Sequence, residues 1–227
     1  MKIDVSKIET ELKKRHQYPY KWYRKQNDIW DGYTNFIYKT LTWEELIKKI
    51  AETVNKHQLD KKELFYYAIN RWYNFWSAMA VEYIFSTCEG VVPEQNSKNR
   101  LIDFTLQEIS FDHKTSVFPK GFNKSFDYAK TNPKELIEWL YKNQSSQQRQ
   151  HFRNRLFLIV HKKDGEHWKL KAEIKLLEKE IKNYVSNFKS SQLQKFIFTT
   201  PTETFSDLIW VEKKIFTKNL LVIQNQT

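Results

Sequence analysis

Two aspartates and a lysine lie within residues 100–117, in two short runs of alternating polar and apolar residues, RLIDFTL and EISFDHKTSV. Successive side chains of a strand point to opposite faces, so Asp112 and Lys114 are expected on one face of the second run. If the runs form a hairpin with a two-residue turn, Asp103 lies directly opposite Asp112. Two carboxylates and an ammonium group would then share one face of a strand pair.

This arrangement of charges predicts a metal-dependent chemistry. Carboxylates that face each other across a strand pair repel, unless a cation lies between them. Mg²⁺ takes oxygen ligands, and Asp103, Asp112 and the main-chain carbonyl of His113 offer them. Lys114, beside one or two such ions, would orient or help to deprotonate an attacking water and stabilise the negative charge of the transition state. The pattern therefore indicates phosphodiester hydrolysis.

An alternative interpretation without catalysis is that Asp112 and Lys114 form an ion pair on an exposed strand and Asp103 lies in a turn. The predicted register depends on Gln107 and Glu108, which lack the Asn-Gly or Asp-Gly chemistry that favours two-residue turns. A slip of one residue would separate the two acids. The histidine between Asp112 and Lys114 is expected on the opposite face from the acids, with its side chain in the core.

With these residues the sequence resembles the PD-(D/E)xK nuclease superfamily, the restriction-endonuclease-like fold. In this resemblance Asp103 is the first acid, Asp112 the second and Lys114 the lysine, and Glu82 is the acid that many members carry on the preceding helix. An isoleucine replaces the motif's proline, the second acid is Asp rather than the commoner Glu, and the two acids are closely spaced. The resemblance covers roughly residues 60–200 and implies a core of helix, three strands, helix and strand.

The resemblance implies a Mg²⁺-dependent endonuclease that cleaves DNA, expected to be double-stranded, as restriction enzymes and related defence nucleases do. The superfamily also contains exonucleases, junction resolvases, repair nucleases and inactive members. An alternative is therefore a nucleic-acid-binding module of this fold that has lost catalysis. A third reading is an interaction protein in which the acids and the lysine form a surface ion-pair cluster. A homodimer would suit a symmetric cut in both strands.

Several helices are predicted around this hairpin. Thr42 with Glu45 matches a capping box, which starts a helix that ends near residue 57. Asp60 with Glu63 starts a long, mostly buried helix to about residue 86. Glu82 lies near its C-terminal end, where the helix dipole disfavours a carboxylate without a positive partner. We expect Glu82 either to complete a metal shell or to pair with Lys114 or Arg100.

The second half of the chain alternates helices and strands. A helix is predicted from Asn132 and Pro133, and another over roughly residues 170–188. The run RLFLIV is typical of a central strand covered on both faces, and FIFTT, LIWVEK and LLVIQ are further expected strands. This order predicts an α/β fold with a mixed central sheet flanked by helices.

Residues 1–58 are expected to form a helical and aromatic extension of a core over residues 59–227, in one compact unit. Residues 16–38 are aromatic and basic without a helical period, and predict a loop or arm packed on the body. Stacking of these rings on nucleobases is the alternative. Side chains near the loop and helix beside the site are candidates for phosphate contacts, with a solvated surface as the alternative: Lys120, Gln148, Arg149, Arg153 and Arg155.

Composition narrows the class of protein. The 227 residues are 40% hydrophobic, which excludes a disordered chain, and the one cysteine excludes a disulfide scaffold. A net charge of +11 favours a polyanionic partner such as nucleic acid. No export signal and no apolar run of membrane-spanning length is apparent, so a cytoplasmic location without a membrane partner is expected. The sequence contains no glycine-rich phosphate loop, so a nucleotide-driven motor is not supported.

Overall fold

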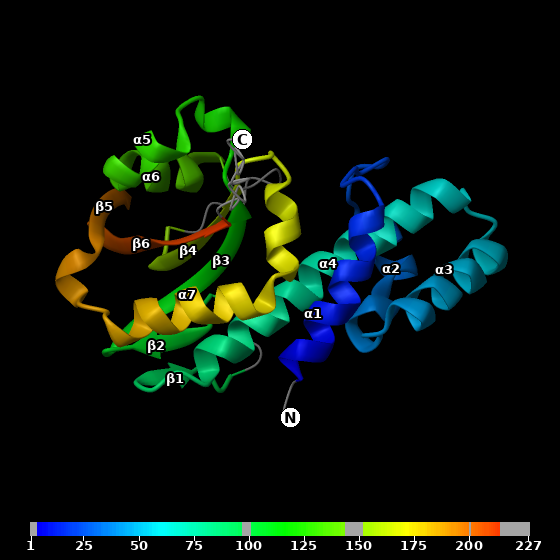
Figure 1. Ribbon diagram of the computed structural model, residues 1–227, viewed down its shortest axis with the longest axis horizontal. Helices are drawn as coiled ribbons and strands as arrows, with labels where there is room; N and C mark the ends of the chain where they lie inside the picture. Colours follow the sequence, from blue (N-terminus) through cyan, green and yellow to red (C-terminus); the bar gives the residue numbers. More distant parts are fainter. Residues whose placement is uncertain (1–3, 97–100, 144–151, 200, 214–227) are drawn as a thin grey trace, which may run out of the picture.

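The computed structural model describes residues 4–96, 101–143, 152–199 and 201–213 (Figure 1). Its strands are β1 (Val91–Pro93), β2 (Phe104–Leu106), β3 (Ile109–Val117), β4 (Arg155–Lys162), β5 (Gln194–Thr199) and β6 (Thr202–Lys213). Its α-helices are α1 (Val5–Lys14), α2 (Asp28–Tyr33), α3 (Trp43–His57), α4 (Lys61–Ser86), α5 (Phe126–Thr131), α6 (Pro133–Asn143) and α7 (Ile174–Ser186). Short 3₁₀ helices are η1 (Arg15–Gln17), η2 (Asn35–Lys39), η3 (Lys120–Phe122), η4 (His167–Ala172) and η5 (Ser190–Gln192).

The strands form one mixed sheet in the order β1-β2-β3-β4-β6-β5. Pairing is antiparallel from β1 to β3, parallel from β3 through β4 to β6, and antiparallel between β6 and β5. Helices α4 and α7 cover one face of the sheet, and α5 and α6 cover the other (Figure 1). The predicted α/β class with a mixed sheet flanked by helices is therefore confirmed.

Strand β4 shows why the sheet has helices on both faces. Leu156, Leu158 and Val160 point into the core beneath α4 and α7, whereas Phe157 and Ile159 point into the core beneath α5 and α6. All five side chains are completely buried. Such continuous burial requires a layer on each face, as the apolar run in the sequence indicated.

The β2–β3 hairpin has the predicted register. Gln107 and Glu108 form its turn with φ of 47° and 66°, the left-handed values that a type I′ turn requires. Phe104 pairs with Phe111, so Asp103, the residue before β2, falls opposite Asp112. Because β2 pairs with only the first three residues of β3, the strand continues beyond its antiparallel partner alongside β4.

Helix α4 is the longest element and joins the sheet to the N-terminal helices (Figure 1). Its predicted cap is confirmed, because the Asp60 side chain accepts a 2.7 Å hydrogen bond from the Glu63 N–H. The predicted capping bond of Thr42 before α3 is wrong. The side chain of Thr42 makes no cap bond, and the Trp43 N–H instead donates at 2.7 Å to Glu11 Oε2, a carboxylate brought in by α1.

Other boundaries also differ from prediction. The arm over residues 16–38 contains α2 and η2, and the expected helix over residues 170–188 is divided at Glu173 into η4 and α7. Strand β1 and helix α5 were not predicted, and the run LLVIQ lies outside the described residues. Within the described ranges, no helix combines the length and apolarity needed to cross a membrane.

Candidate active site

Asp103 immediately precedes β2, where the antiparallel ladder stops. Its N–H donates to the Phe111 carbonyl at 2.8 Å, which extends the ladder by one residue. Its Oδ2 accepts the next bond, from the His113 N–H at 2.7 Å. The carboxylate thus takes the place of a main-chain carbonyl, and the position of Asp103 is fixed by the hairpin itself.

His113 departs from prediction in one respect. Its side chain is buried against the rings of Phe85 and Phe104, as expected for a core-facing histidine. However, it is not separated from the acids, because its Nδ1 lies 2.6 Å from Asp103 Oδ2. Asp103 is outside the regular ladder, so its side chain turns towards the face that carries His113.

Asp112 has a partner that comes from the next strand. Parallel pairing places Arg155 of β4 beside Asp112 of β3, and Arg155 Nε donates to Asp112 Oδ2 at 2.5 Å. The guanidinium also lies over the rings of Tyr141 and Phe157. Arg155 was a candidate for phosphate contacts, but the structure shows it bound to an acid of the site.

The two aspartates influence each other's protonation. Burial and the charge of Asp103 raise the pKa of Asp112, against the opposing effect of Arg155. Burial acts in the same direction on Asp103, but its bonds to His113 and to Asp112 lower the pKa of Asp103 below its ordinary value. The pair therefore titrates as a unit, with Asp103 ionised first.

Glu82 approaches this pair from α4. It shares a cavity of about 160 Å³ with Asp103, lined also by Met79 and Tyr83 of the same helix. Burial, and then the charge of Asp103, raise the pKa of Glu82, while His113 opposes the change. Among the described residues Glu82 forms no ion pair, so the expected pairing with Lys114 is not present; Arg100 lies outside those residues.

Lys114 follows Asp112 by two residues on β3, as the alternation of the strand predicted. Lys114 is exposed as a whole residue, but its amine group is partly buried. Partial burial of that amine and repulsion by Arg155 lower the pKa of Lys114, and Asp112 opposes them. A lysine with a lowered pKa exchanges protons more readily near neutral pH than an ordinary one.

The donor set fits Mg²⁺ by its chemistry. In the parts of the chain that the structure describes, no three His, Cys, Asp or Glu side chains are grouped as a metal site. Mg²⁺ nevertheless typically uses one or two carboxylates, with waters and substrate oxygens for the rest. Asp103 and Asp112 supply this number. The His113 N–H points towards Asp103, and in a strand the carbonyl of the same residue points to the same side.

The remaining candidates for phosphate contacts have separate positions. Lys120 lies in η3 and lines a cavity of about 410 Å³ together with Tyr20, Lys21 and Trp168. Arg153 is exposed just before β4, and its carbonyl accepts a 2.6 Å hydrogen bond from Tyr141. Gln148 and Arg149 lie outside the described residues.

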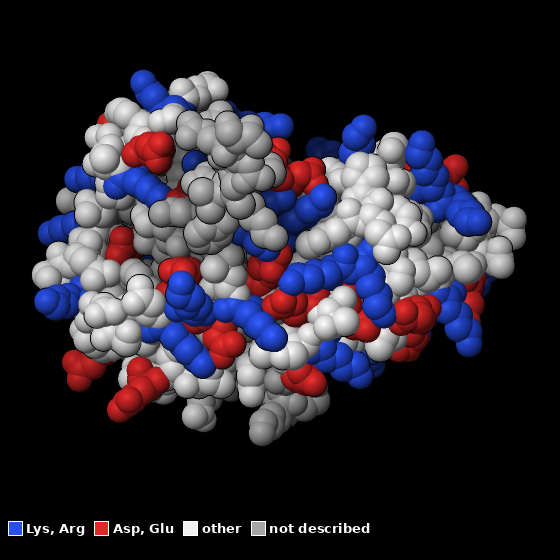
Figure 2. Space-filling model, viewed as in Figure 1, with Lys and Arg blue, Asp and Glu red and all other residues white. Residues whose placement is uncertain are grey.

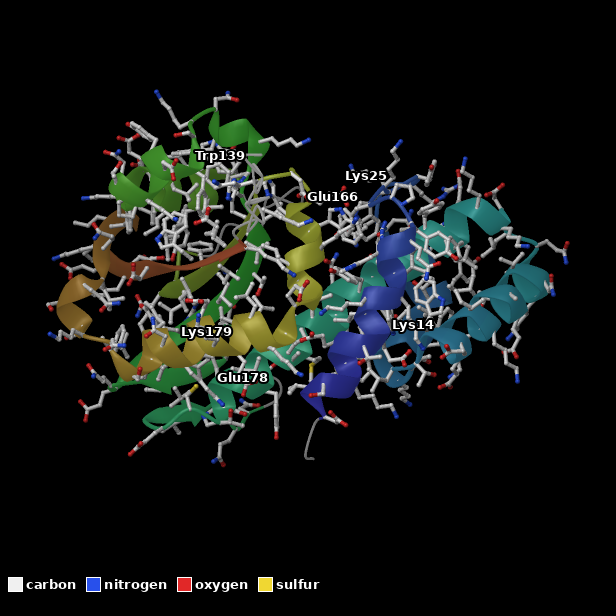
Figure 3. All side chains as sticks on the ribbon, in the orientation of Figure 1. Lys14, Lys25, Trp139, Glu166, Glu178 and Lys179 are labelled. Carbon is white, nitrogen blue, oxygen red and sulfur yellow. The ribbon has the colours of Figure 1, made fainter. Side chains whose placement is uncertain are left out.

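The basic charge of the chain does not form one patch on the visible face. Figure 2 shows Lys and Arg side chains interspersed with acidic ones over both the sheet and the helical part. The N-terminal arm, marked by Lys25, and the loop before η4, marked by Glu166, lie next to each other at the top centre of the view (Figure 3). Both segments line the cavity that contains Lys120.

Sequence reasoning missed two features near the site. One is the pairing of Arg155 with Asp112, which depends on a parallel register between distant segments. The other is Lys171 of η4, whose amine donates to Asn74 of α4 and is affected by the charge of Lys114. The one signal in the sequence was Asn74 itself, a polar residue in an aromatic helix. Comparison of the chain with protein-family models, curated proteins and solved structures gave no match.

Proposed function

We propose that this protein is a Mg²⁺-dependent endonuclease that hydrolyses DNA phosphodiester bonds, with a restriction-endonuclease-like core. The observation that carries the proposal is the hairpin register, which sets Asp103 opposite Asp112 with Lys114 two residues further along β3. A slip of one residue would have removed this arrangement. Instead the two acids are close enough to alter each other's pKa.

The order of elements supports the same proposal. Helix α4, the meander β1–β2–β3, the helices α5 and α6, and then β4 follow one another along the chain. This is the order of helix, three strands, helix and strand that the resemblance to PD-(D/E)xK nucleases implies. Glu82 lies on the helix before the hairpin, next to Asp103, as in the members that carry a third acid.

Each residue has a distinct role in this proposal. Asp103, Asp112 and the His113 carbonyl would hold the metal, with Glu82 beside them; bound there, Mg²⁺ would neutralise charge on the phosphate. Lys114 orients the attacking water, accepts or shares its proton, and stabilises charge that develops on the phosphate. His113 holds the Asp103 carboxylate in place through two contacts to Oδ2.

One observation favours a second function, a nucleic-acid-binding module without catalysis. Both aspartates already contact a protein group, since Asp112 binds Arg155 and Asp103 binds His113. A fixed cation beside an acid can replace a metal in balancing its charge. In such a module the same site would bind DNA without cutting it.

Cleavage of DNA distinguishes the two functions. Supercoiled and linear DNA of several sequences are incubated with the protein and Mg²⁺, with EDTA and Asp112→Asn as controls. The nuclease proposal expects products that disappear in both controls, and discrete bands would show sequence recognition. Salt-sensitive binding without products would support the binding module and contradict the nuclease.

A further inference from the structure

The cavity of about 410 Å³ that contains Lys120 lies at the carboxyl ends of β3 and β4. Three segments that are distant in the sequence meet in it: the arm, the end of β3 and the start of η4. Ligands of open α/β sheets bind outside the carboxyl ends of the strands, and small-ligand sites have volumes of roughly 300–1,000 Å³. The cavity thus has the position and the size of a ligand site.

The cavity meets both faces of the sheet at this end. Val117, the last residue of β3, packs with the core beneath α4 and α7, whereas Phe118 packs with the core beneath α5 and α6. Both residues line the cavity. Val117 follows Lys114 by three residues on β3, which is roughly 10 Å along the strand. A polynucleotide bound at the candidate active site can therefore extend to the cavity.

One wall of the cavity is aromatic and is held in place by the fold. The rings of Tyr20 and Trp168 stack with their centres 5.3 Å apart and 29° between their planes. The Tyr20 hydroxyl exchanges hydrogen bonds of 2.9 and 3.1 Å with the Asn74 side chain of α4. The guanidinium of the buried Arg15 lies 4.6 Å from the centre of the Trp168 ring. The wall therefore needs no ligand to form.

Two exposed lysines also line the cavity, Lys21 from the arm and Lys120 from η3. Neither forms an ion pair within the part of the chain that the structure describes. Glu166 is the acidic residue of the lining, and its carboxylate pairs with Lys169. The cavity therefore presents two cations whose charges are available to an anionic ligand.

His167 adds a neutral donor to this lining. Its Nδ1 accepts a 2.9 Å hydrogen bond from the Lys162 N–H. A neutral imidazole that accepts at Nδ1 carries its proton on Nε2. Burial lowers the pKa of His167, which keeps the ring neutral at pH 7. The Nε2–H group is then a donor, and the main chain fixes this tautomer.

An aromatic wall beside two lysines suits a ligand that is flat at one end and anionic at the other. A nucleotide has both properties, because every base has a π-face and every phosphate carries a charge. In a duplex the neighbouring bases cover these faces, so only an unpaired or extruded base can enter a cavity. The net charge of +11 favours a polynucleotide over a free nucleotide.

We propose that this cavity binds one unpaired nucleotide of a polynucleotide, with its base against Tyr20 and Trp168 and its phosphate contacted by Lys21 and Lys120. His167 donates to an oxygen of the same nucleotide. The proposal rests on the proposed function for the class of ligand. It adds that the bound strand has a base outside the duplex close to the candidate active site.

Binding without metal tests the cavity separately from catalysis. The affinities of a short oligothymidylate, its abasic analogue and a duplex are measured in EDTA at several salt concentrations. The proteins are the wild type, Lys21→Met, Lys120→Met and the control Lys124→Met. Lys124 is also exposed, but it does not line the cavity.

The variants of the two lining lysines should each bind the single strand about fivefold more weakly, with a salt slope reduced by about 0.7. The control should stay within about twofold of the wild type. Removal of the bases should weaken wild-type binding at least about fivefold. Duplex binding should be nearly equal in all four proteins, because paired bases cannot enter. Equal losses for strand and duplex would overturn the proposal, since the lysines would then be general phosphate contacts.

Photochemical crosslinking locates the base without relying on a substitution. A strand that carries iodouracil is irradiated on the wild type in EDTA, and mass spectrometry identifies the modified peptides. We expect modification of Tyr20 or Trp168, reduced in Lys120→Met. Crosslinks confined to other segments would overturn the proposal. So would thymidine monophosphate that raises the melting temperature of a protein to which the strand does not bind.

These outcomes are independent of the proposed function. A protein that cleaves DNA, but whose strand affinity is unchanged in both lining variants, would overturn the role of the cavity and keep the nuclease. A protein that cuts no DNA, but shows the expected losses and crosslinks, would keep the cavity as a nucleotide site and contradict the nuclease.

Discussion

The two aspartates of the candidate site and Lys171 of η4 are all affected by burial, but the fold treats their charges differently. Asp103 and Asp112 each contact a protein group, His113 or Arg155. Lys171, by contrast, has a neutral amide as its partner and a second lysine nearby. Both acids therefore have a partner that can carry a positive charge, whereas Lys171 has only the Asn74 amide as a side-chain partner among the described residues. The difference predicts opposite changes in stability when Asp112 loses its partner and when Lys171 loses its charge.

Among the variants considered, replacement of Lys114 should have the largest effect, and it should act on the rate of cleavage. Lys114→Met removes the group that handles the proton of the attacking water, so we expect the single-turnover rate of DNA cleavage to fall roughly 10²–10⁴-fold. Saturating DNA separates this effect from weaker binding. Lys142→Met, on α6 where the amine pairs with Glu138, is the matched control. A Lys114 variant that cleaves at the wild-type rate would remove the lysine from the mechanism.

Breaking the ion pair on the acidic side should reduce stability. Arg155→Ala leaves the Asp112 carboxylate without its partner in a partly buried position, at an expected cost of about 2–4 kcal/mol in the free energy of unfolding. Urea denaturation measures this loss. The double variant with Asp112→Asn should recover part of it, because no charge then remains unpaired. Equal losses in the single and double variants would show that the arginine acts through packing alone.

Replacing Lys171 should change stability in the opposite direction. Lys171→Met removes a cation that burial destabilises, so we expect the free energy of unfolding to rise by about 1–3 kcal/mol at pH 7. The pKa of Lys171 is about 8 when folded, against 10.5 when exposed. Below pH 8 both states are protonated and the full cost is present; above it the unfolded chain binds more protons, so wild-type stability increases with pH.

The difference in the free energy of unfolding between Lys171→Met and the wild type should therefore decrease as the pH rises from about 8 to about 10.5. Lys114 is the group whose charge acts on Lys171. Tyr20 of the arm shares the partner Asn74 with Lys171, and Tyr73 of α4 donates to the carbonyls of Trp168 and Lys169 in the same 3₁₀ helix. Burial raises the pKa of both tyrosines, so the change in stability over this pH range is attributed to the lysines. Thermal melts across this pH range measure the stability difference. A difference that stays constant would indicate that the amine of Lys171 is exposed to solvent.

The smallest effect is expected at the hairpin turn that aligns the acids. Glu108 has a φ of 66°, which glycine adopts without the strain of a side chain. Glu108→Gly should raise the free energy of unfolding by about 0.5 kcal/mol, because relief of strain exceeds the added chain entropy. Cleavage should remain unchanged, since the register is kept. A loss of cleavage would indicate that the turn residue has a further role.

Local patterns predicted the parts of this structure that depend on neighbouring residues. The run RLFLIV identified β4, the Asp60 cap identified α4, and alternation placed Lys114 beside Asp112. Contacts between distant segments were not predictable in this way. Glu11 takes the place of the Thr42 cap, and the parallel register brings Arg155 to Asp112. The three-residue β1, which ends in proline, has too few residues to show a pattern.

Parallel measurement of cleavage and binding for the wild type, Asp112→Asn and Lys114→Met tests the central claim most directly. With Mg²⁺, Asp112→Asn should bind duplex DNA as the wild type does but leave it uncut. Lys114→Met should cleave far more slowly than the wild type even at saturating DNA. Metal-dependent cleavage that survives in Asp112→Asn would contradict the account, because another site would then hold the metal.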